Sequence, residues 1–235
     1  MKKQDETTTG NNCLKNINSI FRHLTPEQMD LLLCTSTPRK YKKGEILYQE
    51  GHRIHGVYFI ESGIVKIFKT GFDGKEQIIM FGKEGDIIGY RSVMANELAC
   101  TTAKVIDEGL HCFIPANLLL QLVKENPSFS YEIMKLACKE LADANQYITD
   151  LAQKSVRERL ADILLHLVEK FELDDENNLK ISLTREELAN IVGTATESVI
   201  RLLSDFKHSG LIDLQGRKIK ILDMKGLKHI SNAFP

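Results

Sequence analysis

The chain has no surplus of charge and no long apolar segment. Its 31 Lys and Arg residues balance 32 Asp and Glu residues, for a formal net charge of −1. This balance excludes a uniformly basic polymer that binds nucleic acid through charge alone. The longest uninterrupted apolar runs are about four residues, far short of the roughly 20 that span a bilayer. The opening stretch from Met1 to Gly10 is polar throughout, so no signal peptide is expected. We therefore expect a reduced, soluble, cytoplasmic protein that does not enter a membrane.

The cysteines are too scattered to form a framework. They are odd in number and include no Cys-x-x-Cys pair, whereas a disulfide scaffold or a structural zinc site needs closer, paired spacing. Catalytic signatures are missing as well, since the chain has no G-x-S-x-G, no H-E-x-x-H and no phosphate loop ending in Gly-Lys-Ser/Thr. We expect no enzyme, no catalytic residues and no metal site. The cysteines are Cys13, Cys34, Cys100, Cys112 and Cys138.

Glycines punctuate the chain between Lys40 and Pro115, and short β-rich runs lie between them. Many short strands separated by turn signals such as Asp73-Gly74 are typical of an antiparallel barrel or jelly roll. A helix near Leu24–Leu33 precedes them, because Thr25 and Gln28 stand at capping-box spacing. The expected strands are Ile46–Tyr48, Val57–Ile60, Ile64–Phe68, Gln77–Phe81, Ala103–Ile106 and Cys112–Ile114.

The segment from about Pro127 to Ser155 predicts a long helix with a narrow apolar seam. Steps of three and four residues separate the seam positions over about three heptads, as in a coiled coil. A helix packed on its own domain usually has a wider apolar face. The narrow seam and its polar flanks therefore favour a parallel dimer helix. The seam residues are Met134, Ala137, Leu141, Ala144, Ile148 and Leu151.

The C-terminal part predicts a helix-turn-helix. A broad-faced helix over Val156–Phe171 is followed by a capping box from Thr184 to Glu187 and a sharp turn at Gly193. A second capping box, from Thr194 to Glu197, is expected to start the next helix. Its inward positions are Val199, Leu202, Leu203 and Phe206.

The outer face of this second helix carries residue types that read bases. Arg201 can donate two hydrogen bonds to guanine, and Glu197 can accept one from cytosine. The same two residues are four positions apart and could instead form a surface ion pair. A two-stranded wing with a basic tip, Arg217-Lys218, is expected to follow. From Arg201 to Lys228 the chain has 7 basic and 3 acidic residues, which suits a nucleic-acid partner.

Two groups of residues carry a resemblance to a known family. The more specific group comprises Leu183–Gly193 and Glu197–Leu203 in the helix-turn-helix; the weaker one comprises Gly44-Glu45, Gly51 and Gly85–Gly89 in the β region. From about Ile20 to Ile230 the chain resembles bacterial transcription regulators of the CRP/FNR family. The resemblance implies a homodimer that binds palindromic double-stranded DNA near promoters, recruits or blocks RNA polymerase, and responds to a small-molecule effector.

The fold implied is α+β. An N-terminal β jelly roll of the cyclic-nucleotide-binding type is joined by a long dimerisation helix to a C-terminal winged helix-turn-helix. We expect the effector-sensing β-roll domain, with its N-terminal helix, over residues 1–126, the dimerisation helix over 127–154 and the DNA-binding domain over 155–235.

In the family pattern, the residues matching Glu197 and Arg201 read bases, and the one matching Arg185 contacts phosphate. Thr196 stands where the cyclic-AMP receptors have a further base-reading arginine, so the half-site is expected to differ. The expected DNA-binding residues are Arg185, Thr194, Thr196, Glu197, Ile200, Arg201, Arg217 and Lys218.

The effector cassette departs from the cyclic-AMP receptors at three places. Tyr90 stands where they have the ribose-binding Glu, Cys100 where they have the phosphate-binding Arg, and Ala144-Asn145 where they have the adenine-contacting Thr-Ser pair. The resemblance therefore predicts an unknown effector other than cyclic AMP, with Arg91 available to neutralise an anion. The expected pocket residues are Gly89, Tyr90, Arg91, Ser92, Cys100, Thr101, Thr102, Ala144 and Asn145.

Other sensing chemistries stay open at this point. Haem needs one His or Cys ligand, which His52, His55, His111, Cys100 or Cys112 could supply, and Cys100 or Cys112 could act as a thiol switch or be inert. An iron–sulfur sensor is not expected, because Cys13 stands alone near the N-terminus. The rival from another class is a cyclic-nucleotide-binding-like regulatory module, which would leave the helix-turn-helix without a use.

Overall fold

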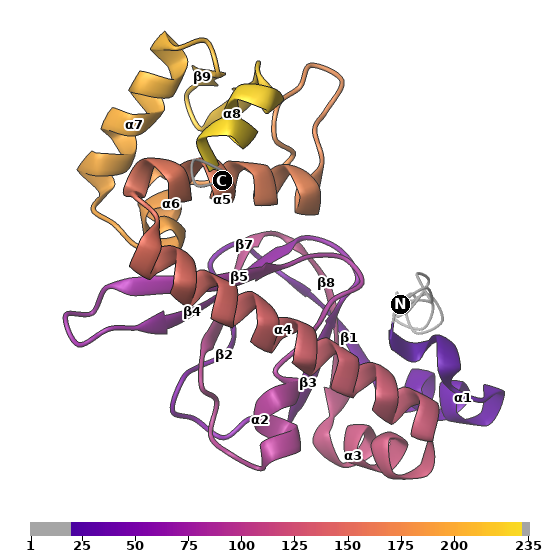
Figure 1. Cartoon of the computed structure of the whole chain (residues 1–235). Helices are drawn as coiled ribbons and strands as arrows, with labels where there is room; N and C mark the ends of the chain where they lie inside the picture. The colour runs from indigo at the N-terminus through magenta and orange to yellow at the C-terminus, as the bar shows by residue number, and fades with distance from the viewer. Residues whose placement is uncertain (1–19, 232–235) are drawn as a thin grey trace, which may run out of the picture. The chain divides into compact units, whose positions relative to one another are not determined.

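A computed structural model describes residues 20–231 (Figure 1). Its contacts divide the chain into two compact units. The first, here the β-roll unit, runs up to Gly74 and from Ile78 to Leu141. The second, here the C-terminal unit, consists of Lys75–Gln77 and the chain from Ala142 onward. The boundary falls within one long helix, α4 (Pro127–Gln153).

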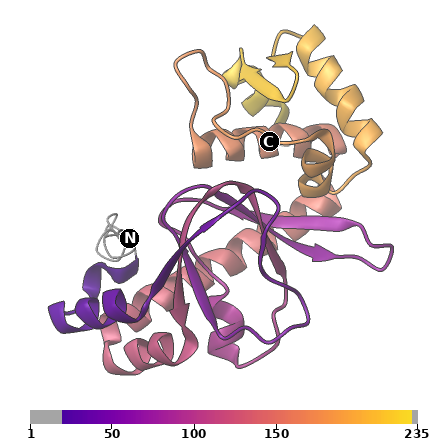
Figure 2. The ribbon, with the colours of Figure 1, turned by 180° about the vertical axis from the view of Figure 1, so that it is seen from behind.

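The β-roll unit contains two four-stranded antiparallel sheets, seen from behind in Figure 2. The first sheet has the order β1 (Thr37–Tyr41), β8 (Gly109–Pro115), β3 (Gly56–Ile60), β6 (Ile87–Ile88). The second has the order β2 (Ile46–Tyr48), β7 (Thr102–Asp107), β4 (Ile64–Thr70), β5 (Glu76–Gly82). Neighbours that are distant in sequence are the mark of a jelly roll, so the predicted fold class is confirmed.

Two apolar clusters hold this unit together. One lies between strands of the two sheets and includes Ile60, Val65 and Ala103. The other packs the first sheet against α1 (Pro26–Thr35), α2 (Tyr90–Ala95), α3 (Ala116–Glu125) and the first turns of α4. Phe21, from the short 3-10 helix Ile20–His23, stacks on Phe129 with ring centroids 5.8 Å apart.

Local capping fixes where these helices begin. The Thr25–Gln28 capping box forms at the start of α1, with Pro26 as its first residue. Asn126 has the same role at α4, because its side chain accepts a hydrogen bond from the amide of Phe129 at 3.0 Å. Each such cap satisfies backbone groups that a helix end would otherwise leave unpaired.

The C-terminal unit is a small winged helical fold. Its elements are α5 (Val156–Phe171), α6 (Arg185–Val192), α7 (Thr196–His208), β9 (Ile212–Gln215), β10 (Lys218–Ile221) and α8 (Met224–Ser231). A capping box between Ser155 and Glu158 starts α5, and β9 and β10 pair antiparallel to form the wing.

All six predicted strands and the long helices are present, with bounds extended by a residue or two at most ends. The elements that were missed include the 3-10 helix Ile20–His23, β1, β6, α2 and α8. The five residues of β1 include Pro38 and expose Arg39 and Lys40, so they show no strand-like alternation. Within residues 20–231, no helix is both long and apolar enough to cross a membrane.

Candidate DNA-reading helix and effector cavity

The first helix of the helix-turn-helix begins and ends as predicted. Thr184 Oγ1 accepts a hydrogen bond from the amide of Glu187 at 3.0 Å, and Glu187 Oε2 accepts one from the amide of Thr184 at 2.8 Å. Gly193 ends α6 with φ of 72°, a left-handed conformation that suits glycine. The chain can therefore turn at once toward α7.

The second capping box, expected from Thr194 to Glu197, does not form. Ala195 is the N-cap of α7, and no side chain caps this helix. The amide of Thr194 instead donates to the carbonyl of Ala189 at 3.1 Å, the same oxygen that accepts from Gly193 at 2.9 Å. Thr194 therefore belongs to the end of α6, because the three-residue turn leaves no room for it to cap α7.

The two faces of α7 differ sharply in exposure. Val199, Leu203 and Phe206 are buried, as predicted, while Leu202 is only partly so. Glu197, Arg201 and Ser204 are exposed on the other face, with Ile200 51% exposed. Among the described residues, no hydrogen bond or ion pair joins Glu197 and Arg201 to each other or to a third side chain. The alternative of a surface ion pair is thus absent from this structure.

Three of the arginine and lysine residues expected at the DNA interface lie in two places: two on the wing turn and one at the start of α6. Arg217 and Lys218 are exposed at the turn between β9 and β10. Arg185 is half-buried: its Nη2 donates to the carbonyl of Gly216 at 2.8 Å, and burial lowers the pKa of its guanidinium. Its Nη1 has no acceptor among the residues described. Arg185 therefore ties the start of α6 to the wing turn.

Two residues that sequence reasoning missed hold the end of α6. Arg159 donates from Nε to the carbonyl of Val192 at 3.1 Å and from Nη2 to that of Gly193 at 3.4 Å. Its Nη1 donates to the carbonyl of Lys154 at 2.8 Å, and Tyr147 Oη donates to the carbonyl of Ile191 at 3.2 Å. No side-chain pattern in the sequence marked either residue, because their acceptors are main-chain carbonyls.

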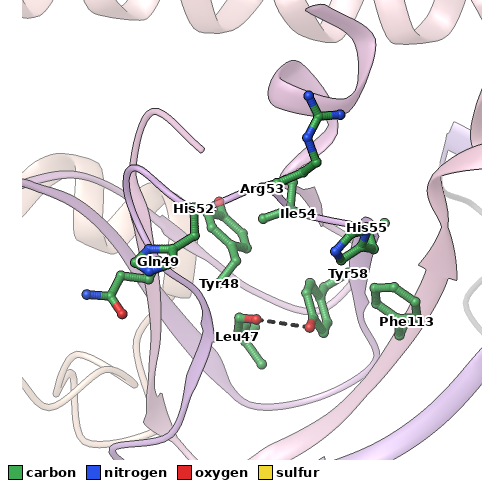
Figure 3. Close-up of a pocket in the computed structure, with 10 residues that line it drawn as sticks. Leu47, Tyr48, Gln49, His52, Arg53, Ile54, His55, Tyr58 and Phe113 are labelled. Carbon is green, nitrogen blue, oxygen red and sulfur yellow. Dashed lines mark hydrogen bonds between the residues drawn. The ribbon is translucent and has the colours of Figure 1, made fainter. Parts of the chain in front are cut away.

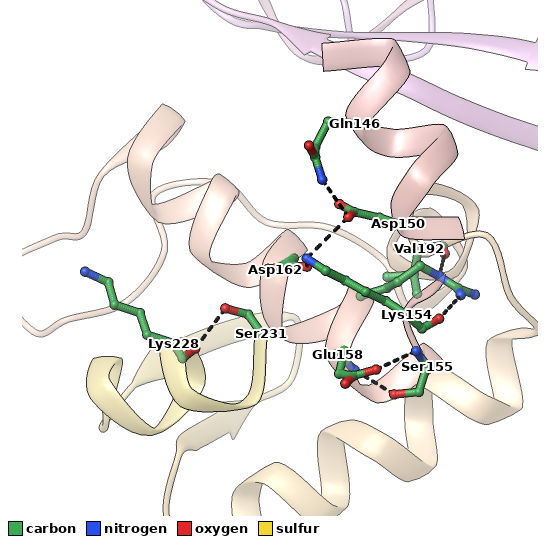
Figure 4. A network of polar contacts seen from close by, with 10 residues as sticks. Gln146, Asp150, Lys154, Ser155, Glu158, Asp162, Val192, Lys228 and Ser231 are labelled. Carbon is green, nitrogen blue, oxygen red and sulfur yellow. Dashed lines mark hydrogen bonds and ion pairs between the residues drawn. The ribbon is translucent and has the colours of Figure 1, made fainter. Parts of the chain in front are cut away.

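Lys154 lies between two carboxylates where α4 passes into α5 (Figure 4). Its Nζ is 3.3 Å from Asp150 Oδ1 and forms a second, closer ion pair with Asp162. Burial opposes the charge of Lys154, but the two carboxylates outweigh it and raise the pKa of the amine. This network and Arg159 together fix the backbone from which the helix-turn-helix starts.

The predicted seam of α4 is largely open. Met134, Leu141, Ile148 and Leu151 are 55%, 63%, 64% and 40% exposed. Only Phe129 and Ile133 are fully buried on this helix. Of the other two seam residues, Ala144 is exposed, whereas Ala137 is half-buried and packs against the core of the β-roll unit.

Most of the predicted effector residues line a small cavity of about 30 Å³. Gly89, at φ of 84°, precedes α2, and Tyr90 is only 3% exposed. Burial and the nearby carboxylate of Glu140 raise the pKa of Tyr90, so its hydroxyl stays neutral. Six of the nine predicted residues line this cavity, while Thr102, Ala144 and Asn145 do not. The six are Gly89, Tyr90, Arg91, Ser92, Cys100 and Thr101.

Arg91 is already engaged at this cavity. Its Nη2 donates to Cys100 Sγ at 3.3 Å, and its Nε is 3.7 Å from Glu140 Oε2. The cavity is about the size of one water molecule, and its arginine faces a carboxylate. The residues present therefore do not fit a cyclic nucleotide.

The residues considered as haem ligands lie apart. His52 and His55 border a second cavity, Cys100 borders the small one, and His111 is fully buried on β8. Neither ring nitrogen of His111 has a hydrogen-bond partner among the described residues, and burial lowers its pKa to about 4. The ring lies 5.4 Å from that of Tyr41.

The described cysteines differ in environment. Cys34, Cys100 and Cys138 are free and exposed, Cys112 is fully buried, and Cys13 lies outside the described residues. Over residues 20–231, no three His, Cys, Asp or Glu side chains gather as a metal ion would require.

A jelly roll with an effector-type cassette and a winged helix-turn-helix with an open reading face define a class of protein, a DNA-binding transcription regulator. Comparison with known families agrees. Residues 38–126 match the cyclic nucleotide-binding domain, and residues 158–230 match the Crp-like helix-turn-helix domain.

Curated relatives carry the comparison across the chain. The transcriptional activator protein Anr of Pseudomonas aeruginosa is 31% identical over 203 residues, which cover 85% of this chain and 83% of the relative. The transcriptional activator protein FnrA of Stutzerimonas stutzeri is 30% identical over 191 residues, covering 80% and 78%. A regulator of the Crp/Fnr family from Eubacterium rectale shares the fold, with a TM-score of 0.75 at 22% identity, over 92% of this chain and 99% of its own. The chain belongs to the CRP/FNR family of transcription regulators and is not an enzyme.

Proposed function

We propose that the chain binds a palindromic promoter site as a homodimer, with α7 of each copy in the major groove. The observation that carries this proposal is the state of Glu197 and Arg201. Both are exposed in the N-terminal half of α7, opposite its buried face, and neither is paired within the described chain. Unpaired side chains of these types are free to meet cytosine and guanine edges.

The wing contributes contacts that do not depend on sequence. Arg217 and Lys218 are exposed cations at a turn, where phosphate oxygens would be their partners. Arg185 supports this arrangement indirectly, since its hydrogen bond to Gly216 holds the wing turn beside the start of α6.

Dimerisation is proposed through the open seam of α4. Three large apolar side chains more than half exposed on one helix, Met134, Leu141 and Ile148, are costly for a monomer in water. A second copy of the same helix would cover them in coiled-coil fashion. Two-fold symmetry of the protein would then impose the palindrome on its site.

The dimer is proposed to recruit or block RNA polymerase at the promoter. Support comes from the relatives in Pseudomonas aeruginosa and Stutzerimonas stutzeri, which are named as transcriptional activators. DNA selection from a random duplex pool, followed by fluorescence anisotropy on the selected and scrambled duplexes, tests the binding step. We expect a palindromic selected site and an affinity that falls steeply with salt. If the chain selects no DNA sequence, the proposal is wrong, and the rival hypothesis of a regulatory module that does not bind DNA is favoured.

The effector is proposed to be something other than cyclic AMP. A hydrogen bond to a charged group contributes about 1.5–3 kcal/mol, and both family groups that supply one to the nucleotide are replaced, by Tyr90 and Cys100. The small volume of the cavity, about 30 Å³, supports the same proposal. Titration calorimetry with cyclic AMP and cyclic GMP should show no binding at low micromolar concentrations. Low-micromolar binding that also tightens operator binding would contradict it.

A further inference from the structure

A second, larger cavity opens in the β-roll unit (Figure 3). Its volume is about 300 Å³, ten times that of the cavity behind α2. The chain between β2 and β3 supplies most of its walls, and Phe113 of β8 completes them. This volume lies at the lower end of the roughly 300–1,000 Å³ found for small-molecule sites.

The inner wall of this cavity is aromatic and apolar. The Tyr58 ring lies between those of Tyr48 and Phe113, with centroids 6.4 and 5.3 Å away. Its hydroxyl donates to the carbonyl of Leu47 at 2.9 Å, so the polar end of Tyr58 is satisfied within the protein. Burial raises the pKa of Tyr48 to about 12, which keeps that hydroxyl neutral. Ile54 adds an aliphatic side chain to the same wall.

Among the lining residues, the rim carries one formally charged side chain, that of Arg53. His52, Arg53 and His55 border it and are exposed, and none of the lining residues is acidic. Arg53 donates from Nη1 to Asn96 Oδ1 at 3.3 Å, and no described carboxylate forms an ion pair with it. Figure 3 draws the Arg53 side chain directed away from the rings of Tyr58 and Phe113. An aromatic wall with an arginine at its rim that pairs with no described carboxylate is complementary to a ring that carries an anionic group.

We propose that this cavity binds a small aromatic monoanion, a one- or two-ring carboxylate or sulfonate. The ring packs against Tyr58 and Phe113, where aromatic contacts add to the apolar burial. The anionic group is met by Arg53 when its side chain turns from Asn96 toward the cavity, where its fork suits two oxygens of one carboxylate. The site is distinct from the effector cavity of the family and needs no DNA binding to exist.

Two wall residues also border the start of the effector cassette. Tyr48 lines both cavities. At Gly89, a Cβ atom would stand 3.3 Å from both Tyr48 Cε1 and Ile54 Cδ1, so these side chains already pack closely on that backbone. An occupant of the larger cavity would therefore touch the residues that hold the N-terminal end of α2.

Titration calorimetry of the full chain with 1-naphthoate tests the proposal. We expect a single sub-millimolar site per chain, and binding of 1-naphthalenemethanol, which has the same rings without the charge, at least about tenfold weaker. Arg53→Gln should weaken 1-naphthoate binding by about tenfold or more. The matched control is Arg39→Gln, an exposed arginine on β1 outside the cavity, which should leave the affinity unchanged.

A blocking variant locates the site. His55→Trp places an indole at the exposed rim, and the chain has no other tryptophan, so a blue-shifted emission would report that the indole occupies the cavity. This variant should keep the wild-type circular dichroism spectrum and bind no 1-naphthoate. No heat with the wild-type chain would overturn the proposal. So would equal losses in Arg53→Gln and Arg39→Gln, or unchanged binding in His55→Trp with its indole buried.

Discussion

The helix α7 and the effector cassette differ in the state of their side chains: those on α7 that are proposed to read bases are exposed and unpaired, whereas those at α2 are buried or already in contact with other residues. On α7 the family's residue types are present, and Glu197 and Arg201 are exposed and unpaired. At α2 the glycine frame is present, with Gly85 and Gly89 both at positive φ, but the side chains have changed. Tyr90 is buried and Arg91 contacts Cys100 and Glu140.

The difference shows that the backbone shape of a binding site and its ligand-binding side chains can be considered separately. Glycines at left-handed positions suit the turns of the cassette, whereas the guanidinium and the carboxylate that line its cavity, Arg91 and Glu140, lie 3.7 Å apart and face each other. On α7 the side chains proposed to contact DNA, Glu197 and Arg201, are exposed and unpaired among the described residues. The chain is therefore expected to bind the type of DNA site that the family binds while responding to another type of effector.

The largest effect is expected at the α4 seam. Leu141→Glu with Ile148→Glu would bury unpaired charges in the proposed dimer interface, at several kcal/mol each after partial relaxation. Sedimentation should then show monomers and operator binding should be lost, while 1-naphthoate binding in the β-roll unit persists. Ala142→Glu, one position off the seam and exposed, is the matched control. A wild-type chain that is only monomeric at tens of micromolar would end the dimer hypothesis.

The next prediction concerns the β-roll unit alone. His111 is fully buried and its folded pKa is about 4, against 6.5 for an ordinary histidine. Below pH 6.5 the His111 side chain is protonated in the unfolded chain but stays neutral in the folded chain. The free energy of unfolding therefore falls as the pH drops toward 4. The loss over that window is roughly 3 kcal/mol, and above pH 6.5 the contribution is constant.

Urea unfolding at pH 7 and pH 5 measures this dependence. His111→Leu should remove about 2 kcal/mol of the difference between the two pH values. His166→Leu, at an exposed histidine of α5, should leave that difference as in the wild type. Equal pH dependence in wild type and His111→Leu would show that His111 is not the group responsible.

The sequence predicted elements wherever local signals agreed with the final packing. Both the Thr25–Gln28 and Thr184–Glu187 capping boxes form because each precedes an amphipathic run. The Thr194–Glu197 box failed because the end of α6 uses the amide of Thr194 first. β1 was missed because its strand character comes from pairing with β8, a partner more than 60 residues away.

The site was predictable only in part. Residue types facing outward on α7 follow from helical periodicity, so Glu197 and Arg201 could be named from the sequence. The role of Arg159 could not be predicted in this way. Its acceptors are the main-chain carbonyls of Val192 and Gly193, which no side-chain pattern marks. The larger cavity was also invisible, because it arises where the loop between β2 and β3 meets Phe113 of β8.

Arg159 offers a test of how the reading helix is held. Arg159→Leu removes three hydrogen bonds to carbonyls around the turn, at about 2–4 kcal/mol in total, because the carbonyls are left partly buried without donors. Urea unfolding of the full chain measures the loss. Arg157→Leu, which gives up only a stacking contact 4.9 Å above the Phe206 ring, should cost about 1 kcal/mol or less. If the two variants lost similar amounts of unfolding free energy, the hydrogen bonds of Arg159 would not be what holds the end of α6.

The smallest effects separate base reading from phosphate contact. Arg201→Ala should cost about 1–3 kcal/mol on the selected operator and relax the preference at one base pair, because one bidentate contact is lost. Lys218→Ala should weaken binding to operator and random duplex alike and flatten the salt dependence, since a phosphate contact carries no sequence information.

Fluorescence anisotropy on both duplexes, each over a series of salt concentrations, distinguishes these outcomes. Both side chains are exposed, so neither substitution should change the fold, and unchanged circular dichroism provides the check. The informative quantity is the ratio of operator to random affinity: Arg201→Ala should lower it, and Lys218→Ala should leave it constant. If both variants changed that ratio equally, α7 and the wing would have the same role in DNA binding. The proposal that the exposed face of α7 reads bases would then be wrong.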